Sequence, residues 1–459
     1  MVFNENRRNL ILAGRPYSLA IKMSIPAIAG MVSVALYSFM DSIFVGQMID
    51  GYAMTAVSVT YPFTLLNTGI SALVGVGSAS VLSRAIGRRD GDTTDRIMGN
   101  LLTTVTVLSL AVMAVMLVFT RPILSLTGAE GQVLEYAVSY AGIVFLGSVF
   151  VNLAQASNMV LRGEGVFREA MGIMAAGAIL NIILDPVFIT AFGDNGIEGA
   201  AWATVVSQAV QLIITLVYFK RRKEGVRLSA PRFDRTIASQ VSSVGMSAML
   251  MQVLTLIQQS LLLWSAARYG GPDYQMIMAA VLRIQAFAFI PLWGVSQGFQ
   301  PVAGTNYGAG EYGRVRECTF AFIAVATFVA LLIYMPMEIM PGTMLSLFIT
   351  DSAIVSMGID ASRIMFLPFI TFGIMIIAIT LLQSTGNART ASLLALSRQV
   401  FLYVPLVLVV PVLMSSEVIG VFVGSMLAEI CVFAICLAAM SSELRKMEKR
   451  TEKPQRVLQ

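Results

Sequence analysis

The basic stretch KRRKEGVRLSAPRFDR, residues 220–235, divides a very hydrophobic chain into two halves. Hydrophobic residues make up 57% of the 459 residues and charged residues only 12%, which is about half the charged fraction of a soluble domain. A helix that crosses a bilayer needs roughly 20 mainly apolar residues. Six such runs precede the basic stretch and six follow it. The sequence therefore predicts an all-α membrane protein with 12 transmembrane helices in two six-helix bundles.

We expect an N-lobe in residues 1–225 and a C-lobe in residues 226–459. The predicted spans are 16–47, 53–83, 95–120, 133–159, 169–191, 196–220, 236–266, 275–305, 315–340, 354–384, 392–413 and 417–440.

Basic residues gather in the polar breaks on one side of these spans. They include the run from Arg84 to Arg96 and the tail from Arg445 to Arg456. Arg162 and Arg398 are assigned to the same set of loops. Because short cytoplasmic loops are enriched in Lys and Arg, both termini are predicted to be cytoplasmic in a multi-pass protein of the plasma membrane. The start, NENRRNLILAGRP, followed by a long apolar run without a small-residue cleavage site, argues against a cleavable signal peptide.

The two halves resemble each other at an offset of 221 residues. GVGSASVLSRAIGRRDGD (75–92) aligns with SQGFQPVAGTNYGAGEYG (296–313), so that Gly77 meets Gly298. At the same offset IEGAAWAT (197–204) falls on VIGVFVGS (418–425), which pairs Thr204 with Ser425. Each half has an even number of spans, so both start on the inside. Parallel repeats of this kind are a common transporter plan.

Two aspartates lie inside hydrophobic segments: Asp41 in YSFMDSIFVGQ (37–47) and Asp185 in NIILDPVFI (181–189). A carboxylate at bilayer depth is costly and usually marks an ion or proton pathway. The alternative is that each aspartate bonds backbone at a kink or helix end. Asp185 precedes Pro186, which would free a carbonyl there.

Topology places polar partners near both aspartates. Asp41, Asp185 and Thr204 all fall in the outer half of the membrane, at comparable heights. Asn181 lies one helical turn from Asp185, and Tyr37 stands in the same relation to Asp41. Carboxylate, amide and hydroxyl oxygens at one level suit a hard cation such as Na⁺, or a shared proton.

The repeat provides a control for these aspartates. At an offset of 221 Asp41 corresponds to Leu262, and residues 401–414 contain no carboxylate. Folding of the six-span unit therefore does not require the aspartates, and the asymmetry favours a function in the N-lobe.

Other candidates give a weaker signal. Glu429, near the middle of the last span, is either a second cation or substrate contact or a satisfied packing residue. Pro26 should kink the first span, as a gating hinge or as a static bend. The chain has no histidine, and Cys318, Cys431 and Cys436 fit no metal or disulfide pattern. We therefore expect no cofactor and no metal beyond a coupling Na⁺.

Several motifs together resemble the MATE family (multidrug and toxic compound extrusion). They are YSFMDSIFVGQM, ASNMVLRGEG, NIILDPVFI, GIEGAAWAT and GVSQGFQPVAGTNYGAG. The resemblance implies a secondary antiporter that exports organic, often cationic and amphipathic, compounds in exchange for Na⁺ or H⁺. It is closest to prokaryotic members with an acidic site in the N-lobe.

Carried over by motif, the resemblance implies that Asp41, Asn181, Asp185 and Thr204 hold the coupling ion. It also implies that Tyr37, Tyr140 and Asn158 line the same cavity. Other members place acidic cation ligands at spans 7 and 10, where this sequence has none.

Two other functions are compatible with parts of this pattern. Related flippases of lipid-linked or other anionic substrates share the two-lobe plan. A flippase of this kind should have a cavity lined by Arg or Lys, but only Arg283 and Arg363 within the spans could fill that role. An intramembrane enzyme lacks a catalytic constellation here. The expected partners are drug-like small molecules and the lipid bilayer, without nucleic acid, for a protein that works as a monomer.

Overall fold

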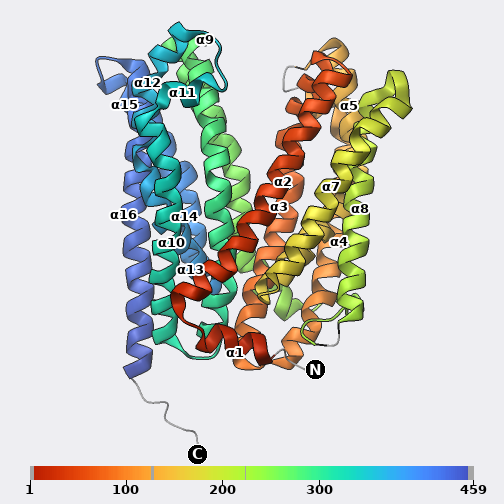
Figure 1. Cartoon of the computed structure of the whole chain (residues 1–459), viewed down its shortest axis with the longest axis vertical. Helices are drawn as coiled ribbons and strands as arrows, with labels where there is room; N and C mark the ends of the chain where they lie inside the picture. The colour runs from red at the N-terminus through yellow and green to blue at the C-terminus, as the bar shows by residue number, and fades with distance from the viewer. Residues whose placement is uncertain (1–4, 126–128, 223, 453–459) are drawn as a thin grey trace, which may run out of the picture. The chain divides into compact units, whose positions relative to one another are not determined.

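The computed structural model describes residues 5–125, 129–222 and 224–452, without the side chains at positions 34, 37–39, 42, 451 and 452. Helices account for nearly all of these residues, and no strand occurs among them (Figure 1). The predicted all-α class is therefore confirmed.

Packing divides the chain into two compact units. The first unit comprises Met1–Arg8 and Ala29–Met249, and the second comprises Asn9–Ile28 and Leu250–Gln459. The predicted lobes are two continuous stretches, residues 1–225 and 226–459. The packing instead assigns residues 9–28 to the second unit and residues 226–249 to the first unit.

Helices of the first unit are, in chain order, part of α1 (Glu5–Ala13), most of α2 (Pro16–Met48), α3 (Gly51–Arg88), α4 (Gly91–Ser125), α5 (Gly131–Leu146), α6 (Ser148–Gly163), α7 (Phe167–Phe192), the 3-10 turn η1 (Gly193–Asn195), α8 (Gly196–Arg221) and the start of α9 (Arg235–Gly308).

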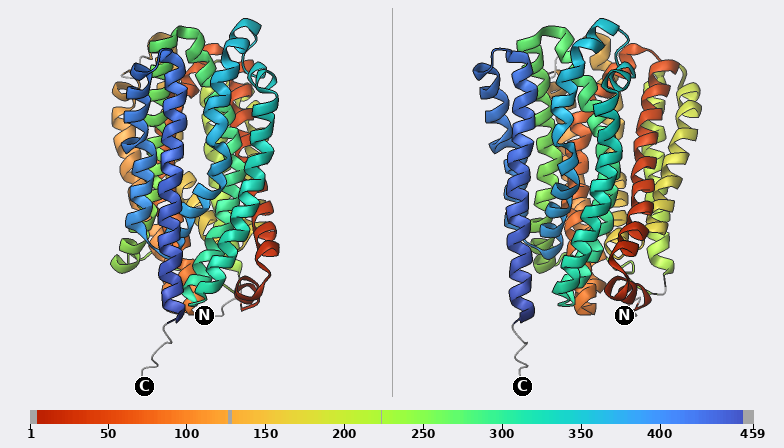
Figure 2. Two further views of the ribbon diagram at one scale, coloured as in Figure 1. Left: turned by 90° about the vertical axis from the view of Figure 1, so that its left-hand side faces the viewer. Right: turned by 60° about the vertical axis from the view of Figure 1, so that its left-hand side comes forward.

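The second unit contains the remainder of α1, α2 and α9, followed by α10 (Tyr312–Ile339), α11 (Pro341–Ser346), α12 (Ser352–Phe366), the 3-10 segment η2 (Leu367–Thr371), α13 (Phe372–Thr385), α14 (Ala388–Leu396), the π-helical segment η3 (Ser397–Phe401), α15 (Tyr403–Leu413) and α16 (Glu417–Glu452). In this unit α16 packs along α15 and α13, and the dark-blue α16 can be followed over its full length in Figure 2.

Eight helical segments in the described part of the chain are long and apolar enough to cross a membrane. A ninth is the pair α5 and α6, which is bent by 53° at Gly147. Helix α9 has 74 residues and, if straight, would measure roughly 110 Å, far more than a bilayer. Its backbone turns at Gly271, where φ is +74°, a conformation that favours glycine. The predicted spans 236–266 and 275–305 correspond to the two arms of α9.

The outer surface of α7 shows which solvent surrounds the protein. Ile179, Ile183 and Val187, at helical spacing, are 58%, 55% and 55% exposed. Asn181 and Asp185 lie on the buried face of the same helix. An apolar outer stripe over a polar interior is the pattern of a helix in lipid. Together with the spans, it identifies a multi-pass membrane protein.

Glycines let helices approach closely in both units. A Cβ on Gly245 would lie 1.6 Å from the carbonyl oxygen of Leu73, so the start of α9 touches the backbone of α3 in the first unit. In the second unit, a Cβ on Gly294 would lie 2.6 Å from the Cα of Ile28, where the other arm of α9 meets α2. Small residues at such crossings are typical of membrane helices.

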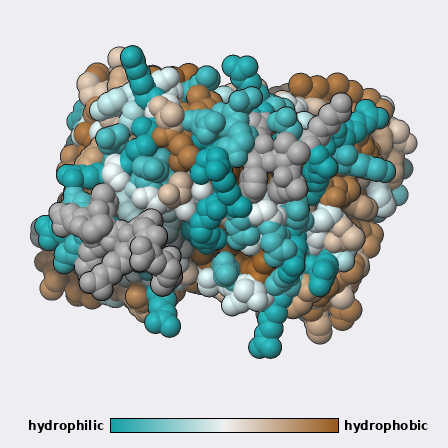
Figure 3. Space-filling view, turned by 90° about the horizontal axis from the view of Figure 1, so that it is seen from below, coloured by the Kyte–Doolittle hydropathy of each residue, from teal (hydrophilic) through white to brown (hydrophobic). Residues whose placement is uncertain are grey.

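Polar contacts gather at one end of the first unit. Arg8 donates to the carbonyl oxygen of Gly87 at 3.1 Å, near the end of α3. Arg7 forms an ion pair with Glu169 in the first turn of α7, at 2.9 Å. The view from below in Figure 3 shows hydrophilic residues gathered on this face, with hydrophobic residues towards its rim.

Candidate functional site

Helix α7 presents Asn181 and Asp185 on one buried face. Residues four apart lie one above the other on a helix. The Asn181 side chain donates from Nδ2 to Oδ1 of Asp185 at 2.9 Å. Asn181 is 2% exposed and Asp185 is 0% exposed. In the described residues the hydrogen bond of Asp185 thus comes from a side chain, not from backbone at the Pro186 kink.

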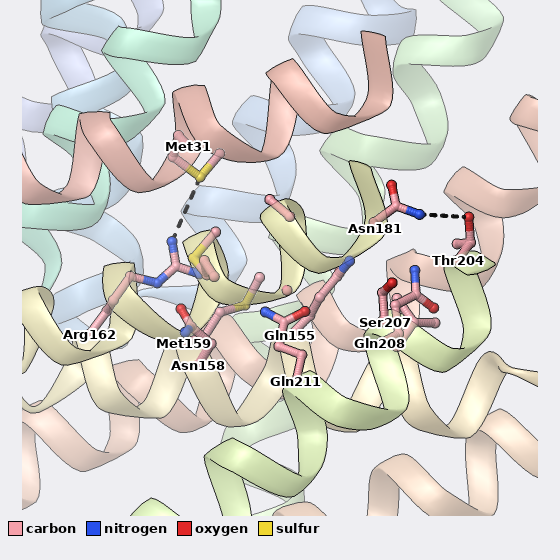
Figure 4. A pocket seen from close by; sticks show the side chains of 14 residues that line it. Met31, Gln155, Asn158, Met159, Arg162, Asn181, Thr204, Ser207, Gln208 and Gln211 are labelled. Atoms are coloured by element: carbon pink, nitrogen blue, oxygen red, sulfur yellow. Dashed lines mark hydrogen bonds between the residues drawn. The ribbon is translucent and has the colours of Figure 1, made fainter. Parts of the chain in front are cut away.

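Helix α8 brings Thr204 to the same place. The Nδ2 of Asn181 lies 3.4 Å from Oγ1 of Thr204, the contact drawn in Figure 4. The two helices pack closely because Gly199 lies against the backbone of Phe188, where a Cβ would come within 2.5 Å of the carbonyl oxygen. Asn181, Asp185 and Thr204, which were predicted to meet, are therefore neighbours.

Asp41 approaches this cluster from α2. Its side chain is 8% exposed, and its carboxyl group lies within electrostatic range of that of Asp185. Within the described part of the chain, Oδ1 of Asp41, Oδ2 of Asp185 and Oδ1 of Asn181 are buried without a hydrogen-bond partner. The described ion pairs include neither aspartate. The cluster therefore offers acceptor oxygens without a fixed cation.

A cavity of about 160 Å³ adjoins the cluster and is enclosed by α2, α6, α7 and α8 (Figure 4). Its wall consists of amides, hydroxyls, methionines, small residues and one guanidinium: Met31, Val151, Gln155, Asn158, Met159, Arg162, Met174, Gly177, Ala178, Asn181, Thr204, Ser207, Gln208 and Gln211. Asn181 and Thr204 belong both to this wall and to the carboxylate cluster.

Of the three residues assigned to the cavity by resemblance, Asn158 and Tyr140 lie in different surroundings. Asn158 is in the cavity wall; it donates to the carbonyl oxygen of Ala170 at 2.9 Å, and its Oδ1 has no partner among the described residues. Tyr140 is buried in a hydrophobic cluster with Val45 and Ile197 and is not among the lining residues. The Tyr37 side chain lies outside the described residues. Pro26 lies within α2.

Arg162 is a cavity residue that the sequence did not reveal. The sequence predicts that the fourth span ends at residue 159, which places Arg162 in a cytoplasmic loop, whereas α6 continues to Gly163. The side chain is only 6% exposed and lies in the cavity wall. Gln155, Gln208 and Gln211 accompany it, and only their position on helices next to the aspartates could have indicated this role.

Glu429 lies in a different kind of site in the second unit. Its carboxylate pairs with the guanidinium of Arg398, with two N···O distances of 3.3 Å, and the residues are 3% and 8% exposed. Arg398 also lies over the rings of Phe289 and Phe372, at 5.3 and 5.1 Å from their centres. The sequence predicts Arg398 in a cytoplasmic loop. The side chain is instead buried and provides Glu429 with a counter-charge.

The repeat partner of Thr204 is also satisfied internally. Ser425 is 2% exposed and its hydroxyl is hydrogen-bonded to that of Tyr403. Nearby, the Gln399 amide donates to Oγ1 of Thr255 at 3.1 Å.

The family model MatE matches the chain twice, at residues 26–187 and 247–409. The two matches begin at residues 26 and 247, which are 221 positions apart, the offset found from the glycine alignment.

Curated relatives match over nearly the whole chain. The multidrug export protein MepA of Staphylococcus aureus (strain MRSA252) is 25% identical over 428 residues, with 92% of each chain covered. MepA of Staphylococcus saprophyticus is 26% identical over 428 residues, with 91% of each chain covered.

Solved structures share the fold. A MATE structure in the bent conformation has a TM-score of 0.90 at 23% identity, covering 97% of this chain and 99% of that one. A MOP superfamily transporter from Pyrococcus furiosus, whose binding pocket has reverse polarity, has a TM-score of 0.89 at 24% identity, covering 96% and 98%. Because the family model covers most of the sequence, this chain belongs to the MatE family of membrane transporters and is not an enzyme.

Proposed function

We propose that the protein is a secondary active multidrug efflux antiporter. It exports organic, often cationic and amphipathic, compounds in exchange for Na⁺ or H⁺. Relatives that are multidrug export proteins support the substrate class. The observation that carries the coupling mechanism is the buried carboxylate cluster of Asp41 and Asp185, whose unpartnered oxygens have no fixed counter-ion in the described part of the chain.

The coupling ion binds to Asp41, Asn181, Asp185 and Thr204, which makes this a member of the type with an acidic N-lobe site. Carboxylate, amide and hydroxyl oxygens are the ligands of a hard cation, and two carboxylates can equally share a proton. Because Asn181 and Thr204 also line the cavity, an occupied ion site changes the wall that the drug contacts. Opposed binding of ion and drug is the minimum requirement for exchange.

Transport follows alternating access of two lobes with twelve membrane crossings. The outward-facing state takes up the ion and releases the drug, and the ion-bound state turns inward. Pro26 in α2 is the proposed hinge, and Asn158, Tyr37 and Tyr140 contribute to the drug path. We place the protein in the plasma membrane with both termini in the cytoplasm.

The test is dye efflux from proteoliposomes under separately imposed Na⁺ and pH gradients. Wild type should transport an organic cation under at least one gradient. In Asp41→Asn and in Asp185→Asn the rate of gradient-driven efflux should fall at least about tenfold, since each variant removes a charge that the ion needs. Full transport by both variants would contradict the coupling site.

A flippase of lipid-linked or other anionic substrates is the second candidate. Arg162 in the cavity wall favours it, because a buried guanidinium attracts anions. A flippase of anionic substrates predicts several basic groups in the cavity wall, however, whereas Arg162 is the only charged side chain among the described residues that line it. Transport of a fluorescent lipid-linked sugar phosphate, without dye efflux, would favour the flippase.

A further inference from the structure

The short helix α1 is divided between the two units. Its residues up to Arg8 belong to the first unit, and its residues from Asn9 onwards belong to the second. Figure 1 shows α1 as a separate short helix before the long α2. Each half of α1 has contacts within its own unit, and the two sets of contacts differ in kind.

The first half of α1 binds the first unit through two arginines. Arg8 donates from Nε to the carbonyl oxygen of Ile86 at 3.2 Å and from Nη2 to that of Gly87 at 3.1 Å. Both carbonyls lie in the last turn of α3, where a cation is favourable. Arg7 pairs with Glu169 of α7 at 2.9 Å, with side chains 31% and 37% exposed. Water reaches this ion pair, so the pair can open at little net cost.

The second half of α1 is held more deeply, within the second unit. Ile11 is 2% exposed, and its carbonyl oxygen accepts a hydrogen bond from Nδ2 of the buried Asn306, near the end of α9, at 3.4 Å. Directly after α1, the carbonyl oxygen of Gly14 accepts one from Nη2 of Arg314 in α10 at 2.6 Å. Opening this attachment would expose an apolar side chain and leave a buried amide without its acceptor, which is more costly than opening an exposed ion pair.

We propose that α1 is a latch on the side of the protein that we place in the cytoplasm. It stays attached to the second unit throughout transport, and its first half releases the first unit each time the units separate on this side. The inference rests on the proposed alternating-access function and names the element that holds this side closed. Because α2 begins at Pro16 and carries Asp41, the latch and the proposed ion site are parts of one nearly continuous helical segment.

The functional test fixes each half of the latch in turn. In a background with all three native cysteines replaced by alanine, Arg7→Cys and Glu169→Cys are bridged with a reducible bifunctional thiol reagent. Dye efflux from proteoliposomes should fall at least about tenfold, because α1 can no longer leave the first unit, and reduction should restore it. The matched control bridges Arg15→Cys and Arg314→Cys within the second unit and should change efflux less than about twofold.

A second measurement follows the latch without transport. Spin labels at the exposed positions Asn9→Cys and Arg88→Cys report the distance from α1 to the end of α3 by double electron–electron resonance, across pH and with and without Na⁺. A population with a longer distance should appear as the protein turns inward. Arg8→Met should enlarge it at least about threefold, because the contact with α3 is lost. Labels at Asn9→Cys and Glu317→Cys, both in the second unit, should keep one distance throughout.

The outcomes separate the latch from the export function. Undiminished efflux after bridging to the first unit would overturn the latch, and so would an equal loss after bridging within the second unit. A single unchanged distance between positions 9 and 88, under conditions in which wild type exports dye, would also overturn it. If wild type exports no dye, or if the unbridged cysteine variant is itself inactive, the effect of Arg8→Met on the distances decides. Only the failure of wild type to export dye counts against the proposed function.

Discussion

The two units bury carboxylates in opposite surroundings. In the first unit Asp185 is bonded by the neutral amide of Asn181 and lies near a second carboxylate, that of Asp41. In the second unit Glu429 is matched by the guanidinium of Arg398, which two aromatic rings enclose.

Under the proposed function, this difference separates an ion-coupling site in the first unit from a packing site in the second. A carboxylate with a permanent counter-charge needs no further cation. Its ion pair adds little net stability while intact, but the loss of either partner leaves an uncompensated buried charge and is costly. A carboxylate without one has to be neutralised by a proton or a mobile cation. The sites should therefore respond in opposite ways when their charges are removed.

The largest expected effect is on the stability of the second unit. Glu429→Gln leaves the buried Arg398 guanidinium without a counter-charge and should lower the free energy of unfolding by about 3–5 kcal/mol. The thermal midpoint in detergent, followed by intrinsic fluorescence, measures the loss. The double variant Arg398→Met with Glu429→Met should recover at least half of it, and a double variant as unstable as the single one would argue against the ion pair as the cause.

Asp185→Asn should leave stability unchanged or raise it, since it removes an unmatched buried charge. The same variant should lose the stabilisation that the coupling ion confers, about 1–3 kcal/mol at saturating concentration. Thermal midpoints with and without Na⁺, and across pH, test both statements. Glu429→Gln is the matched control, and its thermal midpoint should still rise when the ion is added. An equal rise in Asp185→Asn would contradict the proposed difference between the two carboxylates.

Close helix crossings should be sensitive in both units. Gly245→Ala places a Cβ 1.6 Å from a backbone oxygen, and Gly294→Ala places one 2.6 Å from a Cα. Each should cost about 1–3 kcal/mol of stability, measured by thermal midpoint. Gly142→Ala, in α5, meets nothing within 4 Å and should be neutral or stabilising by up to about 1 kcal/mol.

The smallest effect concerns a pair of repeat-related hydroxyls. Thr204→Val removes one oxygen of the proposed ion site and should weaken ion binding about fivefold, close to 1 kcal/mol. Ser425→Ala removes the hydrogen bond to Tyr403 and should lower stability by a similar amount without changing ion dependence. Ion titrations of transport distinguish the two, and a changed ion affinity in Ser425→Ala would show that the second unit takes part in coupling.

Sequence patterns were sufficient for one part of the site. Asn181 and Asp185 are four residues apart in an apolar helix, so helical geometry alone places them on one face. Counting charges in the polar breaks does not predict that the side chains of Arg162 and Arg398 are buried. An arginine close to a predicted span end is equally compatible with a cytoplasmic loop and with a side chain folded back into the helix bundle. Only packing decides between these possibilities.

The division of the chain also depends on packing. Hydropathy predicts that residues 16–47 and 236–266 form spans, but it does not show which bundle each joins. The exchanged segments end at Ile28 and Met249, which are 221 positions apart, so the exchange itself follows the internal repeat.

That exchange has a consequence for biogenesis. The first unit is incomplete until residues up to Met249 have been synthesised, and the second unit requires Asn9–Ile28, which are synthesised before the rest of that unit. Residues 9–28 are therefore made long before residues 250 and onwards, with which they pack in the second unit. A gene split within residues 220–235 would yield two fragments that each carry a helix arm belonging to the other, and that should accumulate stably only when they are produced together.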